Sequence, residues 1–160
     1  MALSIGDRLP DFTLPTDGGG TLDNRDLQGR PVVLYFYPKD DTSGCTKEAV
    51  SFRDQFEQFD QSGVRVVGIS RDSVASHDRF KAKHGLNFTL ASDEDGRICE
   101  AFGVWVEKSM YGKKYMGIER ATFLADGDGL IREVWRQVRV PGHVATVLEA
   151  VEGLRRESLR

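Results

Sequence analysis

The sequence has little cysteine and no strong excess of charge of either sign. Two cysteines in 160 residues are too few for the disulfide framework that holds small secreted domains together. The 22 basic side chains nearly balance the 25 acidic ones, and the formal net charge is -3. This balance gives no reason to expect a nucleic acid or an anionic membrane as a partner.

Long apolar runs are also missing. None approaches the ~20 residues of a membrane-spanning helix, and residues 1–7 lack the basic and apolar regions of a signal peptide or a transit peptide. We therefore expect a cytoplasmic protein without a membrane partner. We also expect a single domain over residues 1–160, because that length suits one hydrophobic core.

Several catalytic motifs are absent. There is no Cys-x-x-Cys pair, which excludes dithiol chemistry, and no Gly-x-Ser-x-Gly elbow, which excludes a serine hydrolase of that type. His77, His84 and His143 form no metal-ligand spacing with either cysteine, so we expect no metal and no cofactor. Residues 126–129, Asp-Gly-Asp-Gly, lack the closing Glu of a calcium loop and predict a hairpin turn instead.

The pattern of apolar residues predicts alternating strands and helices. The predicted strands lie at 32–37, 64–69, 121–125 and 130–135, and the predicted helices at 49–59 (closed by Gly63), 74–84, 97–102 and 144–154. Gly18-Gly19-Gly20 predicts the turn of an N-terminal β-hairpin, and residues 110–115 have the composition of a flexible or partner-facing loop. This order implies an α/β protein with a thioredoxin-like fold, in which helices flank both faces of a central mixed β-sheet.

Cys45 stands where a buried strand gives way to a helix. Residues 38–44 form a polar loop, so Cys45 is expected in the first helical turn. Free amide groups and the positive end of the helix dipole stabilise a thiolate there, and the same amides can bind the oxygens of a small polar substrate. Thr42 suits the N-cap position, from which its hydroxyl can turn toward the sulfur or a substrate.

This loop resembles that of the peroxiredoxins. Their signature, Pro-x-x-x-Thr/Ser-x-x-Cys, is matched in register by Pro38, Thr42 and Cys45. The residues around it are similar to the bacterioferritin comigratory protein branch of this AhpC/TSA-like family, also called peroxiredoxin Q. Further blocks similar to that branch occur at 10–15, 67–70, 90–93 and 115–120, so the likeness covers nearly the whole chain.

The resemblance implies a thiol-dependent peroxidase of antioxidant defence that reduces hydrogen peroxide and organic hydroperoxides. Cys45 would attack the peroxide as a thiolate and become a sulfenic acid. Thr42 would hydrogen-bond the peroxide. The amides of Gly44 and Cys45 would hold the oxygens as the O–O bond lengthens.

Three further site residues follow from the resemblance. Arg120 matches the family arginine that stabilises the thiolate and the developing negative charge, a task suited to a fixed cation with several donors. Pro38 would shield the sulfur from water. Glu48 occupies the family's acidic position, and it either orients Arg120 or is only a favourable charge in the first turn of a helix.

The chain departs from the family pattern at two positions. Ser43 replaces a common proline, which is favoured but not required at the first position of a helix. Val50 stands where many members carry a resolving cysteine, and the predicted helix at 74–84 contains no cysteine either. The usual routes for recycling Cys45 within the chain are therefore missing.

Three recycling routes remain open. A reductant thiol attacks the sulfenic acid directly, Cys99 resolves it within the chain, or Cys99 or another Cys45 resolves it between chains. We favour the first route, with Cys99 as a small packing residue. The resemblance implies thioredoxin, glutaredoxin or a small thiol as the donor, and a monomer. The alternative is a non-catalytic peroxide sensor or redox-switch binding module on the same fold, in which Cys45 reacts once and stops.

Overall fold

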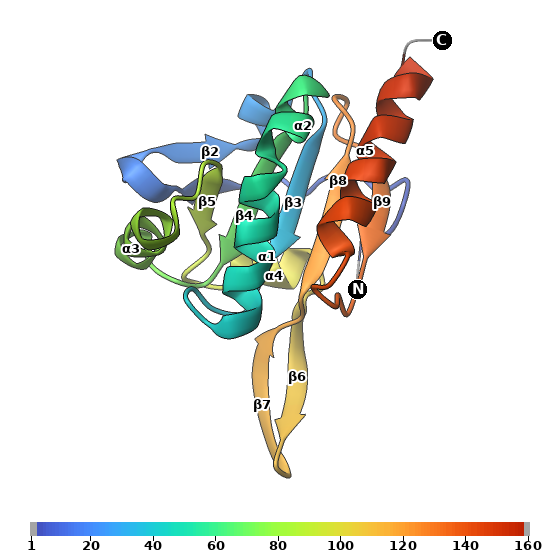
Figure 1. Cartoon of the computed structure of the whole chain (residues 1–160). Coiled ribbons are helices and arrows are strands. Elements are labelled where there is room, and N and C mark those ends of the chain that lie inside the picture. The colour runs from blue at the N-terminus through green and yellow to red at the C-terminus, as the bar shows by residue number, and fades with distance from the viewer. Residues whose placement is uncertain (1–2, 159–160) are drawn as a thin grey trace.

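The computed structural model of the chain describes residues 3–158, which are organised around a five-stranded sheet (Figure 1). The strands follow the order β5-β4-β3-β8-β9. Their bounds are Val32–Phe36 for β3, Arg65–Ser70 for β4, Thr89–Ser92 for β5, Ala121–Ala125 for β8 and Ile131–Trp135 for β9. β3, β4 and β5 run parallel, β8 is antiparallel to β3, and β9 is antiparallel to β8. The sheet is mixed, as the sequence predicted.

The central strand β3 is buried along its whole length because the sheet carries a core on each face. Val33 and Tyr35 pack into one core, and Leu34 and Phe36 pack into the other. Successive side chains of a strand point to opposite faces, so a strand covered on both sides has to be apolar throughout.

Helices cover both faces of the sheet (Figure 1). Phe52 of α1, Phe59 of α2, Phe80 of α3 and Val147 of α5 share one core, whereas Ile98 of α4 belongs to the other. The bounds are Ser43–Asp54 for α1, Phe56–Gln61 for α2, Val74–His84 for α3, Arg97–Ala101 for α4 and His143–Ser158 for α5. Within residues 3–158, no helix is long and apolar enough to cross a membrane.

Two predicted hairpins are present. β1 (Thr13–Pro15) and β2 (Thr21–Asp23) pair antiparallel and form the N-terminal hairpin. The turn between β8 and β9 is closed by Asp126, whose carboxylate accepts hydrogen bonds from the amides of Asp128 and Leu130. An Asp side chain that accepts from the amides of its own turn is typical of such tight turns.

The helix predicted to end at Gly63 is instead broken at Gln55 into α1 and α2. Gln55 leaves the helical region, with φ −102° and ψ 8°. The break is compatible with the core because the rings of Phe52 and Phe59, one on each side of it, remain 5.8 Å apart. Apolar spacing alone could not reveal it, since the same face stays apolar across the break.

Residues 110–115 do not form the predicted loop. β6 (Trp105–Met110) and β7 (Lys113–Ile118) pair as a hairpin that projects from the body of the protein (Figure 1). Tyr111 and Gly112 connect them, both with positive φ. Two consecutive residues in that region give the turn whose twist matches a two-residue hairpin, and tyrosine is a rare choice for it.

Gly68→Ala is expected to destabilise the protein by about 1–3 kcal/mol, the usual effect of overpacking a core. A Cβ atom at Gly68 would lie 2.9 Å from the ring and hydroxyl of Tyr35 and 3.0 Å from Leu90. Unfolding in urea measures the loss. Gly153→Ala in α5 is the matched control, because a Cβ there meets only Arg156, at 3.9 Å, and alanine favours a helix. Equal unfolding midpoints for the two variants would contradict this packing.

Candidate active site

Cys45 lies in the first turn of α1, at the edge of the sheet where β3 ends (Figure 1). Its side chain is only 2% exposed. The helix begins at Ser43, so the amides of Gly44 and Cys45 have no partner within it, and the carbonyl of Thr42 accepts the first helical bond from Thr46. The sulfur therefore lies at the positive end of a helix, as the sequence predicted, and it is also buried.

Arg120 joins Cys45 to Glu48. It lies between β7 and β8, and its Nη2 is 3.3 Å from the Cys45 sulfur, while its Nη1 is 2.8 Å from Oε1 of Glu48. Burial works against its charge, but Glu48 and Cys45 outweigh this effect and raise the pKa of Arg120 above its usual value. Such a guanidinium can stabilise negative charge on the sulfur and on an oxygen bound beside it.

Glu48 is fully buried, and its Oε2 has no hydrogen-bond partner within residues 3–158. Burial raises the pKa of Glu48 to about 7, although Arg120 partly offsets the effect. The hydroxyl of Tyr35 is a second buried polar atom without a partner in the same part of the chain. Burial, followed by the nearby charges of Glu48 and Cys45, raises the pKa of Tyr35. The pocket therefore concentrates acidic groups around one cation.

Thr42 occupies the N-cap position of α1, as expected, but its side chain does not cap the helix. Its hydroxyl donates to the carbonyl of Lys39 at 2.8 Å, which leaves the oxygen lone pairs free to accept from a bound molecule. Gly44 lies against Arg120, since a Cβ at that position would be 3.1 Å from Nη2. Pro38 is half-buried and belongs to the wall of a groove beside the site.

That groove has a volume of about 440 Å³ and is formed largely by the β6–β7 hairpin. Trp105, Met116 and Ile118 give it apolar walls, and Arg71 and Lys108 contribute positive charge. Burial and then Arg120 lower the pKa of Lys108, while Cys45 acts in the opposite direction, so Lys108 is within electrostatic reach of the sulfur. Sequence reasoning missed Lys108, because nothing in its neighbourhood indicated a hairpin beside the site.

His143 was considered only as a possible metal ligand, yet it lies near Arg120. It is buried at the start of α5, and its Nε2 is 2.8 Å from the hydroxyl of Thr122. Burial, together with the charge of Arg120, lowers the pKa of His143 to about 4. The ring is therefore neutral at physiological pH and adds no second positive charge beside Arg120.

Cys99 lies in α4 and is fully buried in the core on the other face of the sheet from Cys45. Burial, and then the neighbouring Asp93, raise the pKa of Cys99 well above its usual range. Asp93 also accepts hydrogen bonds from the amides of Ile98 and Cys99, which fixes the start of α4. A protonated thiol in this position is a poor nucleophile.

One group of side chains in residues 3–158 has the composition of a metal site. Asp40, Asp72 and His77 bring potential ligand atoms within 4.8 Å of one another. These atoms already hydrogen-bond to one another or to neighbouring protein groups. They form a closed polar network, not an open set of ligands.

Comparison with known proteins gives one family over most of the chain. Residues 5–134 match the family described as AhpC/TSA family. The chain is similar to a Coxiella burnetii protein named putative peroxiredoxin bcp, with 56% identity over 148 residues that cover 92% of this chain and 98% of that one. It is also similar to peroxiredoxin Bcp of Bacillus subtilis, with 46% identity over 154 residues that cover 96% and 98%.

Solved structures agree. A cysteine-to-serine mutant of PrxQ from Xylella fastidiosa has a TM-score of 0.91 at 43% identity and covers 96% of this chain and 98% of its own. The bacterioferritin comigratory protein of Xanthomonas campestris, in a structure concerned with its alkyl peroxide reduction activity, has a TM-score of 0.86 at 45% identity. The match covers 90% of this chain and 92% of that one.

Glu48→Gln is expected to remove a pH dependence of stability. Because the folded-state pKa of Glu48 is about 7, above its usual 4.5, the folded protein binds more protons between these values. Glu48 therefore lowers the free energy of unfolding of the wild type as the pH rises through this window. As the pH rises from 4.5 to about 7, the free energy of unfolding of the variant should increase relative to that of the wild type by up to about 3 kcal/mol. A tenfold change in proton affinity corresponds to about 1.4 kcal/mol.

Urea unfolding of both proteins at a series of pH values measures this difference. Titrating groups that lie away from Glu48 and Arg120 are shared by the two proteins, so they cancel. A difference that stays constant from pH 4.5 to about 7 would show that Glu48 does not titrate there.

Proposed function

The chain belongs to the AhpC/TSA family, as a peroxiredoxin of the bacterioferritin comigratory protein branch, and we propose that it reduces peroxides through Cys45. The observation that carries this proposal is the contact of 3.3 Å between the Arg120 guanidinium and the Cys45 sulfur at the start of α1. A helix start and a fixed cation together favour a thiolate, and they also favour the negative charge that develops on a peroxide oxygen.

The first step forms an S–O bond and breaks the O–O bond. The Cys45 thiolate attacks one peroxide oxygen, and the other oxygen leaves with the electron pair, takes up a proton, and departs as water or an alcohol. Arg120 and the amides of Gly44 and Cys45 stabilise the developing charge, and the hydroxyl of Thr42 holds the peroxide. Pro38 limits the access of water to the sulfur. Cys45 becomes a sulfenic acid.

Glu48 acts through Arg120 in this scheme. Its Oε1 receives one side of the guanidinium at 2.8 Å, and that contact turns the other side toward the sulfur. This geometry supports the orienting role over a simple helix-dipole role, because the carboxylate faces Arg120 from full burial.

The groove beside the site supports organic hydroperoxides as substrates besides hydrogen peroxide. Its apolar walls at Trp105, Met116 and Ile118 suit an alkyl group. Reduction of an alkyl peroxide is the activity with which the Xanthomonas campestris relative is associated.

For the second step we propose direct reduction by an external thiol. The thiol sulfur attacks the sulfenic acid, an S–S bond forms and water leaves, and a second thiol then releases Cys45. Thioredoxin, glutaredoxin or a small thiol supplies these two thiols in this proposal. The protein is further proposed to be cytoplasmic and monomeric, with residues 1–160 forming one domain. The burial of Cys99 on the other face of the sheet, together with its raised pKa, supports a packing role for that residue.

Cys45→Ser is expected to abolish peroxide consumption, because no other thiol near Arg120 can accept the oxygen. Cys99→Ser, its matched control, should keep turnover. Turnover is followed with a thioredoxin system, and the intact mass is taken after one equivalent of hydrogen peroxide, with and without a sulfenic-acid trap. A gain of one oxygen at Cys45 fits direct reduction, whereas a loss of two hydrogens by the monomer would assign Cys99 as the resolving residue. Stoichiometric oxidation without turnover would identify a sensor.

Arg120→Met is expected to slow oxidation of Cys45 by about 10²–10³-fold, the usual effect of losing one donor to a developing oxyanion. Arg120→Lys keeps the charge but cannot contact Cys45 and Glu48 together. Its rate of Cys45 oxidation should therefore lie between those of Arg120→Met and the wild type. Stopped-flow measurement of the oxidation step gives the three rates. Equal rates in all three proteins would remove Arg120 from the mechanism.

A further inference from the structure

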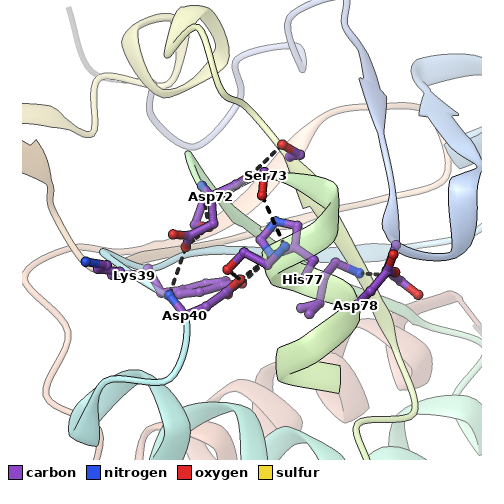
Figure 2. A network of polar contacts seen from close by, with 12 residues as sticks. Lys39, Asp40, Asp72, Ser73, His77 and Asp78 are labelled. Carbon is purple, nitrogen blue, oxygen red and sulfur yellow. Dashed lines mark hydrogen bonds and ion pairs between the residues drawn. The ribbon is translucent and has the colours of Figure 1, made fainter. Parts of the chain in front are cut away.

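A buried polar network surrounds Asp40, in the loop that precedes α1 (Figure 2). Its centre is Asp40, five residues before Cys45 and almost wholly buried. The carboxylate of Asp40 accepts from the hydroxyl of Tyr37 at 2.5 Å and from the hydroxyl of Ser76 at 2.8 Å, and it lies 2.7 Å from Nδ1 of His77. The end of β3 and helix α3 thus meet at a single loop side chain.

The contacts of His77 define its charge. The ring is completely buried, with Nδ1 facing the Asp40 carboxylate and Nε2 lying 3.0 Å from the carbonyl oxygen of Ala91. A carboxylate and a carbonyl can only accept hydrogen bonds, so both ring nitrogens have to carry protons. His77 is an imidazolium, paired with Asp40 out of water.

The backbone of the loop is tied down at the same residue. The amide of Asp40 donates to Asp72 at 2.8 Å, and Asp72 is itself held by the hydroxyl of Ser70 at 2.6 Å. Figure 2 shows Asp40 between Asp72 on one side and His77 of α3 on the other. Removal of the ion pair would therefore loosen a single point that fixes both the main chain and the side chain of the loop.

Asp41 and Thr42, which follow Asp40, are held by side-chain contacts that lie near the surface. Asp41 has φ +59°, an unfavourable conformation for a residue other than glycine, and its carboxylate contacts the exposed Lys83 and the half-buried His84 of α3. Thr42 then begins α1 without a side-chain cap. The buried side-chain hydrogen bonds of the loop before Cys45 are therefore those of Asp40.

We propose that Asp40 and His77 are positioning residues for Cys45: their buried ion pair holds the loop before α1, and so sets both the placement of the sulfur against Arg120 and the ease with which the first turn opens. Neither residue touches the sulfur or the peroxide. The inference rests on the proposed function, because an external thiol has to reach a sulfur that is 2% exposed in the closed loop.

The anchor depends on pH. Asp40 and Asp72 face the ring from the loop and from the segment before α3, and Tyr37 faces it from the end of β3, with its hydroxyl 3.5 Å from Nδ1. Burial alone would lower the pKa of His77, but the bond to Asp40 outweighs it, and the pKa lies above the usual 6.5. The stabilisation is complete below pH 6.5 and is lost as the pH rises through the raised value. Above it, the bare Nε2 would face the Ala91 carbonyl.

The test compares Asp40→Asn and His77→Gln with the wild type. Asp17→Asn is the matched control, because it removes a partly buried carboxylate that binds Lys81 of the same helix α3 and lies outside the loop. Cys45 oxidation by hydrogen peroxide is measured by stopped flow. Labelling of Cys45 by a maleimide, divided by the thiolate fraction from ultraviolet absorbance, reports opening, and labelling of Cys99 reports global unfolding.

In Asp40→Asn and His77→Gln we expect oxidation of Cys45 to slow by roughly tenfold to a hundredfold, the range that a small misplacement of a reacting group produces. Labelling of Cys45 should rise by about tenfold while that of Cys99 stays unchanged, because only the local opening is released. Asp17→Asn should alter neither rate. Unchanged rates in Asp40→Asn and His77→Gln, or equal increases at Cys45 and Cys99, would overturn the positioning role.

A second test uses the pH dependence of Cys45 labelling in the wild type, which is not destabilised by a substitution. Its corrected labelling of Cys45 should increase as the pH rises above 6.5, and the increase should be absent from His77→Gln, in which Glu48 and the other groups still titrate. If neither or both proteins show the increase, the imidazolium is not the anchor. Labelling requires no peroxide, so a wild type that fails to reduce peroxide would refute the proposed function without deciding the role of His77.

Discussion

The site depends on one guanidinium that serves two buried acidic groups. Arg120 contacts the sulfur of Cys45 and the carboxylate of Glu48, and Glu48 has no access to water. Two negative charges beside one cation in a low dielectric cannot both be fully stabilised. Burial raises the pKa of Glu48 to about 7, and Arg120 offsets only part of this effect, so the carboxyl can bind a proton near neutral pH. When Glu48 is protonated, the positive charge of Arg120 acts mainly on the sulfur of Cys45.

The two sides of the site are supported by different physical means. Arg120 precedes β8, which pairs with β3 over its full length, so the register of that pairing brings Arg120 to the carboxyl end of β3. Cys45, in contrast, follows a loop, and that loop is fixed by the hydrogen bonds of Asp40 and not by strand pairing. A sheet register is rigid, whereas a hydrogen-bonded loop can be released locally. The proposed opening of the site is therefore expected on the side that carries the sulfur.

What the sequence could reveal follows from how local each feature is. The strand, loop and helix around Cys45 are adjacent in the chain, and their pattern predicted the sheet and the place of Cys45 in the first helical turn. Arg120 is 75 residues away from Cys45, and only the resemblance to a family pointed to it. His77 and Lys108 gave no signal, because the partners of His77 lie far along the chain and the hairpin of Lys108 depends on an uncommon turn at Tyr111. The surroundings of both residues are set by contacts between distant parts of the chain, which composition does not reveal.

The burial of Cys45 sets a further requirement on the loop. A peroxide is small enough to enter a closed pocket, but a sulfenic acid at the same place has to meet a second sulfur atom, and an S–S bond needs close approach of the two chains that carry it. Cys99 cannot provide that sulfur while the sheet separates the two cysteines, and neither Val50 nor α3 offers one. In the proposed direct reduction by an external thiol, the first turn of α1 therefore has to open toward solvent. In a chain without a nearby resolving cysteine, the strength with which the loop is held therefore sets the balance between reaction with peroxide and access of the reductant.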